Sequence, residues 1–146
     1  MAGSDEPDSG NRETRPLIPR AVHAGARILV VEDEEIVRRY LHRGLTHAGY
    51  EVLTAADGQE GLEAYQLAPV GIDLLILDHH LPRLSGGELL DRVRALRPNQ
   101  PVLRVSADHK LPERIDAWPG RSAPLLLKPF SVEQLLDAVA GALRKD

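Results

Sequence analysis

Short apolar runs alternate with amphipathic segments along most of the chain. Five of these runs are mainly apolar rather than alternating, which is typical of parallel strands that are covered on both faces. They are Ile28–Val31, Val52–Ala55, Leu74–Leu77, Val102–Val105 and Leu125–Leu127. Parallel strands need a right-handed crossover, usually through a helix. The alternation therefore predicts an α/β fold, a (βα)5 doubly wound parallel sheet.

The polar and apolar positions also mark helices between these runs. Apolar residues share one helical face in the first and last helical segments. They are Ile36, Val37, Tyr40, Leu41 and Leu45 in the first, and Val132, Leu135, Leu136, Val139 and Leu143 in the last. Three helix starts have capping-box spacing, namely Asp57-x-x-Glu60, Ser85-x-x-Glu88 and Ser131-x-x-Gln134. Gly49 is suited to end the first helix.

Two regions depart from this regular alternation. Residues 1–26 are polar and almost without periodicity, so they cannot bury enough apolar surface to offset the entropy of ordering. We expect a disordered N-terminal tail or linker at 1–26 and a single domain at 27–146. The fourth crossover, residues 108–124, contains Pro112, Pro119 and Gly120, so we expect a short or irregular helix there.

Composition narrows the function classes. The chain has 18 basic and 22 acidic residues, a net charge of −4 and only 3% aromatic residues, which argues against nucleic-acid binding. No apolar run is long enough to cross a membrane, and the N-terminus lacks the features of a secretory signal. We therefore expect a cytoplasmic protein. The chain has no cysteine, so its chemistry must use oxygen and nitrogen ligands.

Chemistry-bearing residues stand at the carboxyl ends of the predicted strands. In an open α/β sheet, the functional site forms at that edge. The residues there are Glu32 and Asp33, Asp78, Ser106 and Lys128. Three clustered carboxylates repel one another, and a hard divalent cation such as Mg²⁺ resolves this repulsion in a site made of oxygen ligands. We expect Asp78 to act as the nucleophile of a phosphoryl transfer, with Ser106 and Lys128 contacting the phosphoryl oxygens.

These pieces together resemble the receiver domains of two-component response regulators, which share the flavodoxin-like fold with strand order 2-1-3-4-5. The resemblance covers about residues 27–145. Its motifs are Ile28-Leu29-Val30-Val31-Glu32-Asp33-Glu34-Glu35, then Asp73-Leu74-Leu75-Ile76-Leu77-Asp78 followed by His79-His80-Leu81-Pro82, then Ser85-Gly86, Ser106-Ala107 and Lys128-Pro129-Phe130. Each motif is weak alone, but the ordered set at strand ends is specific.

The resemblance implies a role for each site residue. Asp78 would accept the phosphoryl group, Glu32, Asp33 and Asp78 would hold Mg²⁺ or Mn²⁺ together with the backbone carbonyl of His80, and Ser106 would be the switch hydroxyl. Lys128 would be the lysine of the fifth strand. The side chains of His80 and Asp108 would flank the route of hydrolytic water and tune dephosphorylation. The phosphoryl donor would be a histidine kinase or a histidine phosphotransfer protein.

Three departures from the family gather in one region. The position three residues before Lys128, usually aromatic, is Leu125. The usually apolar fourth strand carries Arg104, and the following helix is shortened by prolines. We expect a remodelled output face, with Arg104 paired to Glu113, Asp116 or a backbone carbonyl. The alternative is that Arg104 extends to solvent at a poorly covered face.

Two further groups have competing interpretations. The basic residues Arg38, Arg39, His42 and Arg43 are either a solvated helix face or a docking surface for the phosphoryl donor. The pair His79-His80 invites a zinc hypothesis, but adjacent residues leaving a strand point in opposite directions and no third ligand follows at the usual spacing. We therefore expect no zinc site.

Two alternatives to a phosphoacceptor also stay open. One is a phosphorylation-independent interaction module, suggested by Leu125, and the other is a small Mg²⁺-dependent phosphohydrolase, in which His80 stands where a second Asp is expected. The last predicted helix ends near residue 143, so we expect no output domain in this chain. The start at Met1 favours a stand-alone regulator, whereas the segments 85–90 and 124–130 look more like the receiver of a hybrid kinase.

Overall fold

The computed structural model describes residues 24–68, 71–108 and 123–144, and these form one parallel sheet between two helical layers. The strands are β1 (Arg27–Val31), β2 (Glu51–Ala55), β3 (Leu74–Asp78), β4 (Val102–Ser106) and β5 (Leu125–Leu127), in spatial order β2-β1-β3-β4-β5. The helices are α2 (Glu35–His47), α3 (Gly58–Leu67), α4 (Gly86–Leu96) and α5 (Val132–Leu143). The predicted doubly wound fold is confirmed.

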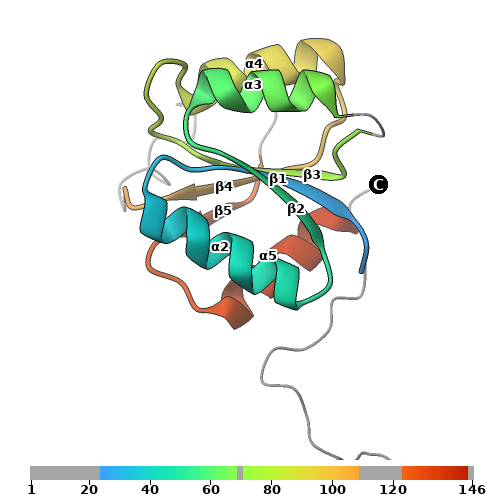
Figure 1. Ribbon diagram of the computed structural model, residues 1–146, viewed down its shortest axis with the longest axis vertical. Helices are drawn as coiled ribbons and strands as arrows, with labels where there is room; N and C mark the ends of the chain where they lie inside the picture. The colour runs from blue at the N-terminus through green and yellow to red at the C-terminus, as the bar shows by residue number, and fades with distance from the viewer. Residues whose placement is uncertain (1–23, 69–70, 109–122, 145–146) are drawn as a thin grey trace, which may run out of the picture.

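The two faces of the sheet bury separate apolar clusters, because successive side chains of a strand point to opposite faces. Figure 1 shows α3 and α4 on one face and α2 and α5 on the other. Leu29 and Leu75 pack under α3 and α4, whereas Ile28 and Ile76 pack against α2 and α5. This double coverage explains the continuous apolarity of β1, β3 and β4, whose residues are almost all buried.

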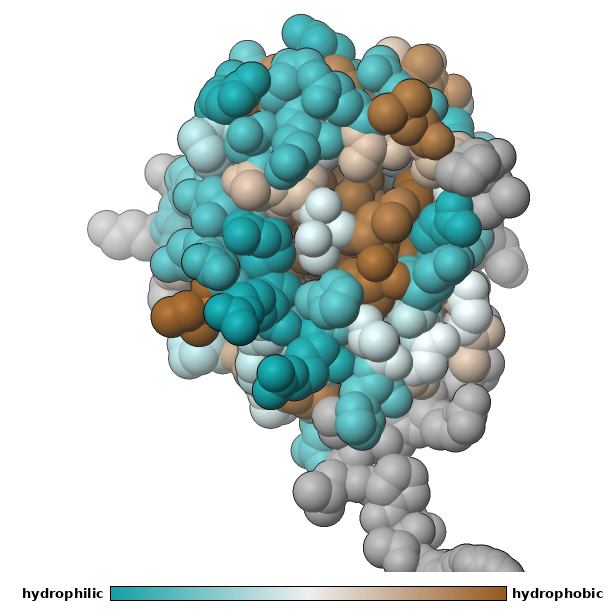
Figure 2. Space-filling view, in the orientation of Figure 1, coloured by the Kyte–Doolittle hydropathy of each residue, from teal (hydrophilic) through white to brown (hydrophobic). Residues whose placement is uncertain are grey.

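The edge strand β2 departs from that expectation. Among the described residues, β2 pairs with β1 alone, and three of its five residues are exposed. Leu53 is 37% exposed. Figure 2 shows a hydrophobic area over β2, between the hydrophilic surfaces of α2 and α3. An apolar run therefore marked this strand correctly but overstated its burial.

The helix ends follow the sequence signals. Asp57 caps α3 by accepting the Glu60 N–H, and complete capping boxes start α4 at Ser85 and α5 at Ser131. Gly49 follows α2 with φ +111°, a conformation that favours glycine. These caps satisfy backbone amides that would otherwise have no partner in the helix.

The apolar face of α2 is only partly in the core. Leu41 and Leu45 are fully buried, but Ile36 is 83% exposed because it lies in the first turn, near the end of the sheet. Tyr40 is 40% exposed, and its hydroxyl donates a hydrogen bond to the carbonyl of Phe130, which lies in the loop before α5. The helical period was therefore correct, while the burial of the first turn was not.

Two sequence predictions fall largely outside this structure. Residues 1–23 and 109–122 lie outside the described residues, so the predicted tail and the irregular fourth crossover stay predictions. At the start of the described chain, the Gly25 N–H donates to the Gly49 carbonyl and the Glu51 N–H donates to the Ala26 carbonyl. Among the described residues, no helix has the length and hydropathy to span a membrane.

Candidate functional site

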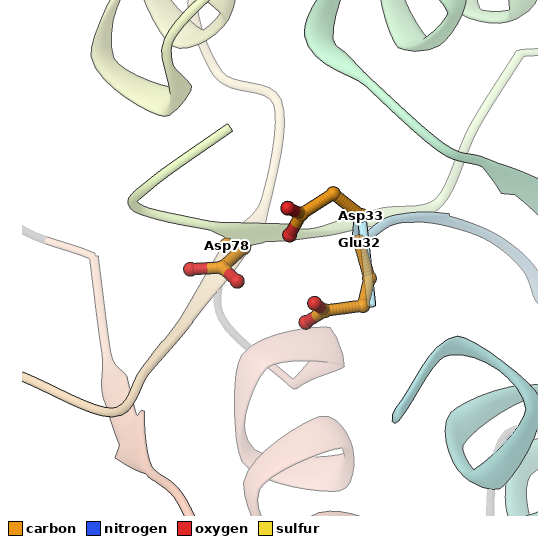
Figure 3. A group of neighbouring side chains, drawn as sticks. All are labelled: Glu32, Asp33 and Asp78. Atoms are coloured by element: carbon orange, nitrogen blue, oxygen red, sulfur yellow. The ribbon is translucent and has the colours of Figure 1, made fainter. Parts of the chain in front are cut away.

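Three carboxylates converge where β1 and β3 end. Parallel strands end at the same edge, so Glu32 and Asp33 after β1 come close to Asp78, the last residue of β3. One carboxylate oxygen from each lies within 4.8 Å of the others. Figure 3 shows the three side chains turned toward a common space. Glu32 and Asp78 are buried, whereas Asp33 is exposed and forms the outer side of the cluster.

Backbone contacts hold the segment after β1 in place. The Glu32 N–H donates to the Ala55 carbonyl at 3.0 Å, which extends the β1–β2 pairing by one residue. A guanidinium N–H of Arg38 donates to the carbonyl of Glu32 at 2.8 Å and, more weakly, to that of Asp33 at 3.4 Å. The first turn of α2 therefore supports the backbone that carries both acidic residues.

Lys128 neutralises part of this negative charge. Its ammonium Nζ lies 3.0 Å from Glu32 Oε1 and 3.0 Å from Asp78 Oδ2. A third carboxylate, Glu34 Oε1, lies 3.3 Å away. The Lys128 backbone N–H donates to the Ser106 carbonyl at 2.8 Å, which ties the end of β5 to the end of β4. The structure therefore brings the predicted lysine into direct contact with the predicted phosphoacceptor.

Burial and charged neighbours determine the protonation states of Glu32 and Lys128. The pKa of Glu32 is raised from 4.5 to about 7, mainly by loss of hydration and also by the nearby charge of Asp78, against the opposing effect of Lys128. Burial would lower the pKa of Lys128, but its close contacts with the carboxylates of Glu32 and Asp78 outweigh that effect and raise the pKa above 10.5. Lys128 is therefore charged at neutral pH, while Glu32 is close to its midpoint.

The cluster fits a hard divalent cation. Glu32 Oε1 is buried and close to Lys128, but their geometry does not form a hydrogen bond, so this oxygen can take a further ligand. Carboxylate oxygens are the ligands that Mg²⁺ and Mn²⁺ prefer. Among the described residues, the group able to hold a metal contains Glu32, Asp33 and Asp78 and no histidine. This composition supports the magnesium prediction and not the zinc hypothesis.

The predicted hydroxyl and the two predicted tuning residues lie on the neighbouring loops. Ser106 is fully buried at the end of β4, and its Oγ accepts the Asp108 N–H at 3.0 Å. The His80 N–H donates to Asp78 Oδ1 at 3.1 Å, and the His80 imidazole Nε2 lies 3.9 Å from Asp108 Oδ2. His80 and Asp108 therefore face each other across the loops that follow β3 and β4.

A glycine allows α4 to start against this site. An added Cβ at Gly86 would lie 2.5 Å from the Asp78 carbonyl oxygen and 3.0 Å from that of His79. The Gly86 N–H also donates to the His79 carbonyl. Only a residue without a side chain fits so close to the backbone that carries Asp78. Beside this contact is a hollow of about 440 Å³ whose lining includes Asp33, His80 and Ser85.

Arg104 is buried in the sheet face that packs against α3 and α4. Its guanidinium donates twice to the Ala123 carbonyl, from Nε at 3.0 Å and from the terminal nitrogen at 2.6 Å. Arg104 is 9% exposed and pairs in register with Leu125 and Leu77. It therefore takes a backbone carbonyl, one of the expected partners, and does not extend to solvent. Glu113 and Asp116 lie outside the described residues.

The basic strip on α2 has two kinds of members. Arg39, His42 and Arg43 are exposed, and Arg39 forms a 3.6 Å ion pair with Glu35. Arg38 is partly buried because its guanidinium turns toward the carbonyls after β1. With Thr54 of β2, the four basic residues line a shallow hollow of about 310 Å³.

Three contributors to the site were missed by the sequence reasoning. Glu34 adds a third carboxylate to Lys128, and Arg38 holds backbone carbonyls. Glu34 and Gly86 were noted only as parts of family motifs, without a role in the site. Glu34 directly follows the acidic pair Glu32-Asp33 in the sequence. Because all three residues come after the end of the same strand, this position could have indicated that Glu34 lies near the site.

Comparisons with known proteins identify the family of this chain. The family model described as "response regulator receiver domain" matches residues 28–140. An uncharacterised transcriptional regulatory protein, YkoG of Bacillus subtilis, is 38% identical over 119 residues, which are 82% of this chain and 51% of YkoG. Transcriptional regulatory protein TrcR of Mycobacterium tuberculosis is 34% identical over 89% of this chain and 50% of TrcR. The chain thus spans about half the length of these relatives.

Solved structures give the same result for the fold. A response regulator receiver domain protein of Clostridium thermocellum matches with a TM-score of 0.73 and 30% identity, covering 81% of this chain and 94% of the other. The chemotaxis protein CheY4 of Vibrio cholerae matches with a TM-score of 0.72 and 32% identity, covering 82% and 99%. Because two relatives are named as transcriptional regulatory proteins, the comparisons do not support the expectation that nucleic acid is not a partner.

Proposed function

The chain belongs to the response regulator receiver domain family, and on that premise we propose that it accepts a phosphoryl group on Asp78. Members of this family are signalling proteins rather than enzymes in the ordinary sense, and they bind Mg²⁺ at an acidic site. The observation that carries the proposal is the contact of the buried Asp78 carboxylate with Lys128, beside Glu32 and Asp33.

In the proposed step, a carboxylate oxygen of Asp78 attacks the phosphorus of a phosphohistidine donor. The new P–O bond forms while the P–N bond breaks, and the electron pair stays on the donor imidazole nitrogen, which takes up a proton. Asp78 is suited to this because it is held at the strand end by the His80 N–H and by Lys128. Its carboxylate is therefore oriented before the donor arrives.

The neighbouring residues would hold the phosphoryl oxygens. The Lys128 ammonium is already within 3.0 Å of the acceptor carboxylate, and the Ser106 hydroxyl can donate a hydrogen bond while its oxygen accepts the Asp108 N–H. Glu32, Asp33, Asp78 and the His80 carbonyl would hold the divalent cation. When bound, that cation supplies charge neutralisation for the transferring phosphoryl group.

Response regulators interact with histidine kinases, and we propose a histidine kinase or a histidine phosphotransfer protein as the donor for this chain. The basic strip of Arg38, Arg39, His42 and Arg43 is a candidate contact for such a donor, since it lies on the helix that begins at the acidic pair. Neutralising Arg43 should then make phosphotransfer slower and less sensitive to salt. If the phosphotransfer rates of the wild type and of the Arg43 variant depend equally on salt, the strip is only a solvated helix face.

The output of the domain is also part of this proposal. Leu125 replaces the usual aromatic, and the Arg104 contact with the Ala123 carbonyl connects β4 to the segment that precedes β5. We propose that the phosphorylated domain signals through contacts with other proteins, made near the hydrogen bonds between Arg104 and the Ala123 carbonyl. His80 and Asp108, which face each other near Asp78, would set the lifetime of the phosphorylated state.

Intact mass spectrometry tests the phosphoacceptor directly. The wild type and the Asp78→Asn variant are incubated with acetyl phosphate, with and without Mg²⁺. Asp91→Asn is the matched control, because Asp91 is an exposed carboxylate on α4. The proposal expects a gain of one phosphoryl group in the wild type and in the control, only with Mg²⁺, and no gain in Asp78→Asn.

Each alternative has its own signature in this experiment. Folded wild-type protein that never gains the phosphoryl group, even from a histidine kinase, would favour a phosphorylation-independent interaction module. Continuous release of inorganic phosphate at a rate typical of an enzyme would favour the phosphohydrolase. Uptake that persists in Asp78→Asn would move the acceptor to another residue.

A further inference from the structure

Lys128 contacts one more carboxylate than the proposed phosphoryl site requires. Glu34, the residue before α2, places its Oε1 3.3 Å from the ammonium, while its backbone N–H donates to Glu32 Oε2 at 3.0 Å. The side chain of Lys128 is only 12% exposed, so its few contacts dominate its environment. One ammonium therefore faces Glu32, Glu34 and Asp78.

The three carboxylates differ in their freedom to move. The side chains of Glu32 and Asp78 are 0% and 8% exposed, so neither can leave Lys128 without becoming a buried charge with less compensation. The Glu34 side chain is 63% exposed and can turn into water at little cost, because exposed ion pairs contribute little to stability. Glu34 is thus the contact that an arriving phosphoryl oxygen can displace.

Glu34 also adds negative charge on the exposed side of Lys128. The buried carboxylates are partly balanced by Lys128 and would be balanced further by a divalent cation. The Glu34 carboxylate is not part of the group that would hold the cation, so its negative charge is in excess. This charge lies near Asp78, because Glu34 Oε1 and Asp78 Oδ2 lie 3.3 Å and 3.0 Å from the same ammonium. Coulomb repulsion grows in proportion to the charge of the approaching molecule.

We propose that Glu34 is a specificity-determining residue that selects phosphoryl donors by charge. Its carboxylate competes for Lys128 and repels dianionic small-molecule donors more than singly charged ones. This inference rests on the proposed function, since it concerns transfer to Asp78. It assigns Glu34 a positioning role through Lys128, not a contact with the reacting atoms.

The test compares two donors of different charge on three proteins. Acetyl phosphate is the dianionic donor and phosphoramidate the singly charged one. The proteins are the wild type, Glu34→Gln and Glu35→Gln. Glu35 is the matched control because it is the next residue, is 69% exposed and pairs with Arg39 at 3.6 Å. The Mg²⁺ affinity of each protein is measured by calorimetry, so that rates are compared at equal metal occupancy.

The expected result is a change in donor preference. Glu34→Gln should raise the rate constant for phosphoramidate about twofold and that for acetyl phosphate about fourfold, because doubling the charge of the donor squares the factor by which the electrostatic repulsion slows the reaction. The difference should shrink at high ionic strength. Glu35→Gln should leave the ratio of the two rate constants close to that of the wild type.

Two kinds of result would overturn the inference. Equal changes for both donors, or the same shift in ratio for Glu35→Gln, would show that Glu34 does not select by charge, while the proposed function would stand. No phosphoryl uptake by the wild type from either small-molecule donor would overturn this inference, and if a histidine kinase also fails to phosphorylate the folded protein, the proposed function is overturned with it.

Discussion

The buried carboxylate of Glu32 should make the metal-free protein less stable as the pH rises. Burial raises its pKa from 4.5 to about 7 in the folded state. Between these two values the folded protein holds a proton that the unfolded chain has lost. Raising the pH therefore favours unfolding across this range. The stability that the neutral carboxyl contributes is fully present below pH 4.5 and is lost as the pH passes about 7.

The size of the effect follows from the same shift. One pKa unit corresponds to about 1.4 kcal/mol, so Glu32 should account for a loss of about 3 kcal/mol across that range. The raised pKa of Lys128 adds nothing within this window, because its contribution is lost only when the pH rises through the alkaline range. The change Glu32→Gln keeps the shape of the neutral carboxyl and removes the titration.

Urea unfolding followed by circular dichroism, with a chelator present, measures this difference. At about pH 5 the wild type and Glu32→Gln should have similar free energies of unfolding, and at about pH 8.5 the variant should be more stable by about 2 to 3 kcal/mol. Glu133→Gln, which changes an exposed carboxylate on α5, should show no such divergence. Parallel pH profiles for the wild type and Glu32→Gln would refute the reasoning.

Mg²⁺ binding offers a second measurement of the same group. A metal ligand must be ionised, so binding near pH 6 should release about one proton from Glu32 and binding near pH 8.5 almost none. Calorimetry in two buffers with different ionisation enthalpies counts these protons. The absence of proton release near pH 6 would mean that Glu32 is already ionised or does not bind the metal.

Three further changes have defined outcomes. Gly86→Ala should lower the free energy of unfolding in urea by about 2 kcal/mol, because its Cβ would lie 2.5 Å from a backbone carbonyl oxygen. Gly141→Ala is the control: its added Cβ would meet nothing within 4 Å, so this variant should be as stable as the wild type or more stable. Arg104→Met should cost about 1 to 3 kcal/mol in the same assay, because the Ala123 carbonyl loses both of its guanidinium donors. Asp108→Ala should shorten the lifetime of the phosphorylated protein severalfold, because the loss of this side chain opens the pocket to water. The intact mass followed over time measures this lifetime, and an unchanged lifetime would mean that Asp108 is only a solvated loop residue.

Much of the fold could be predicted because each strand is a mainly apolar local run and the starts of α3, α4 and α5 are local caps. The site could be located for a related reason, since the ends of parallel strands must meet at one edge. Glu32, Asp78 and Lys128 each end or follow a strand, so their meeting needs no knowledge of side-chain conformation.

The remaining contacts depend on conformation that a residue pattern does not encode. Arg38 looked like part of a solvated strip, but its long side chain turns back to two backbone carbonyls. Ile36 fitted the apolar period of α2 but lies beyond the region that the sheet can cover. The Arg104 partner could be narrowed to three candidates, and only the three-dimensional path of the chain brings the Ala123 carbonyl to it.

The open edge at β2 bears on how the protein behaves at high concentration. A strand with an unpaired edge can template pairing with a second chain, and a hydrophobic area over it strengthens that tendency. Here the strand is only five residues long, and its exposed positions include the charged Glu51, which is paired with Arg27, and the hydroxyl of Thr54. Short length and a charged end are features that natural sheets use against aggregation. Glu51 therefore contributes to protecting this edge from pairing with a second chain, at the opposite end of the strands from the proposed phosphoryl site.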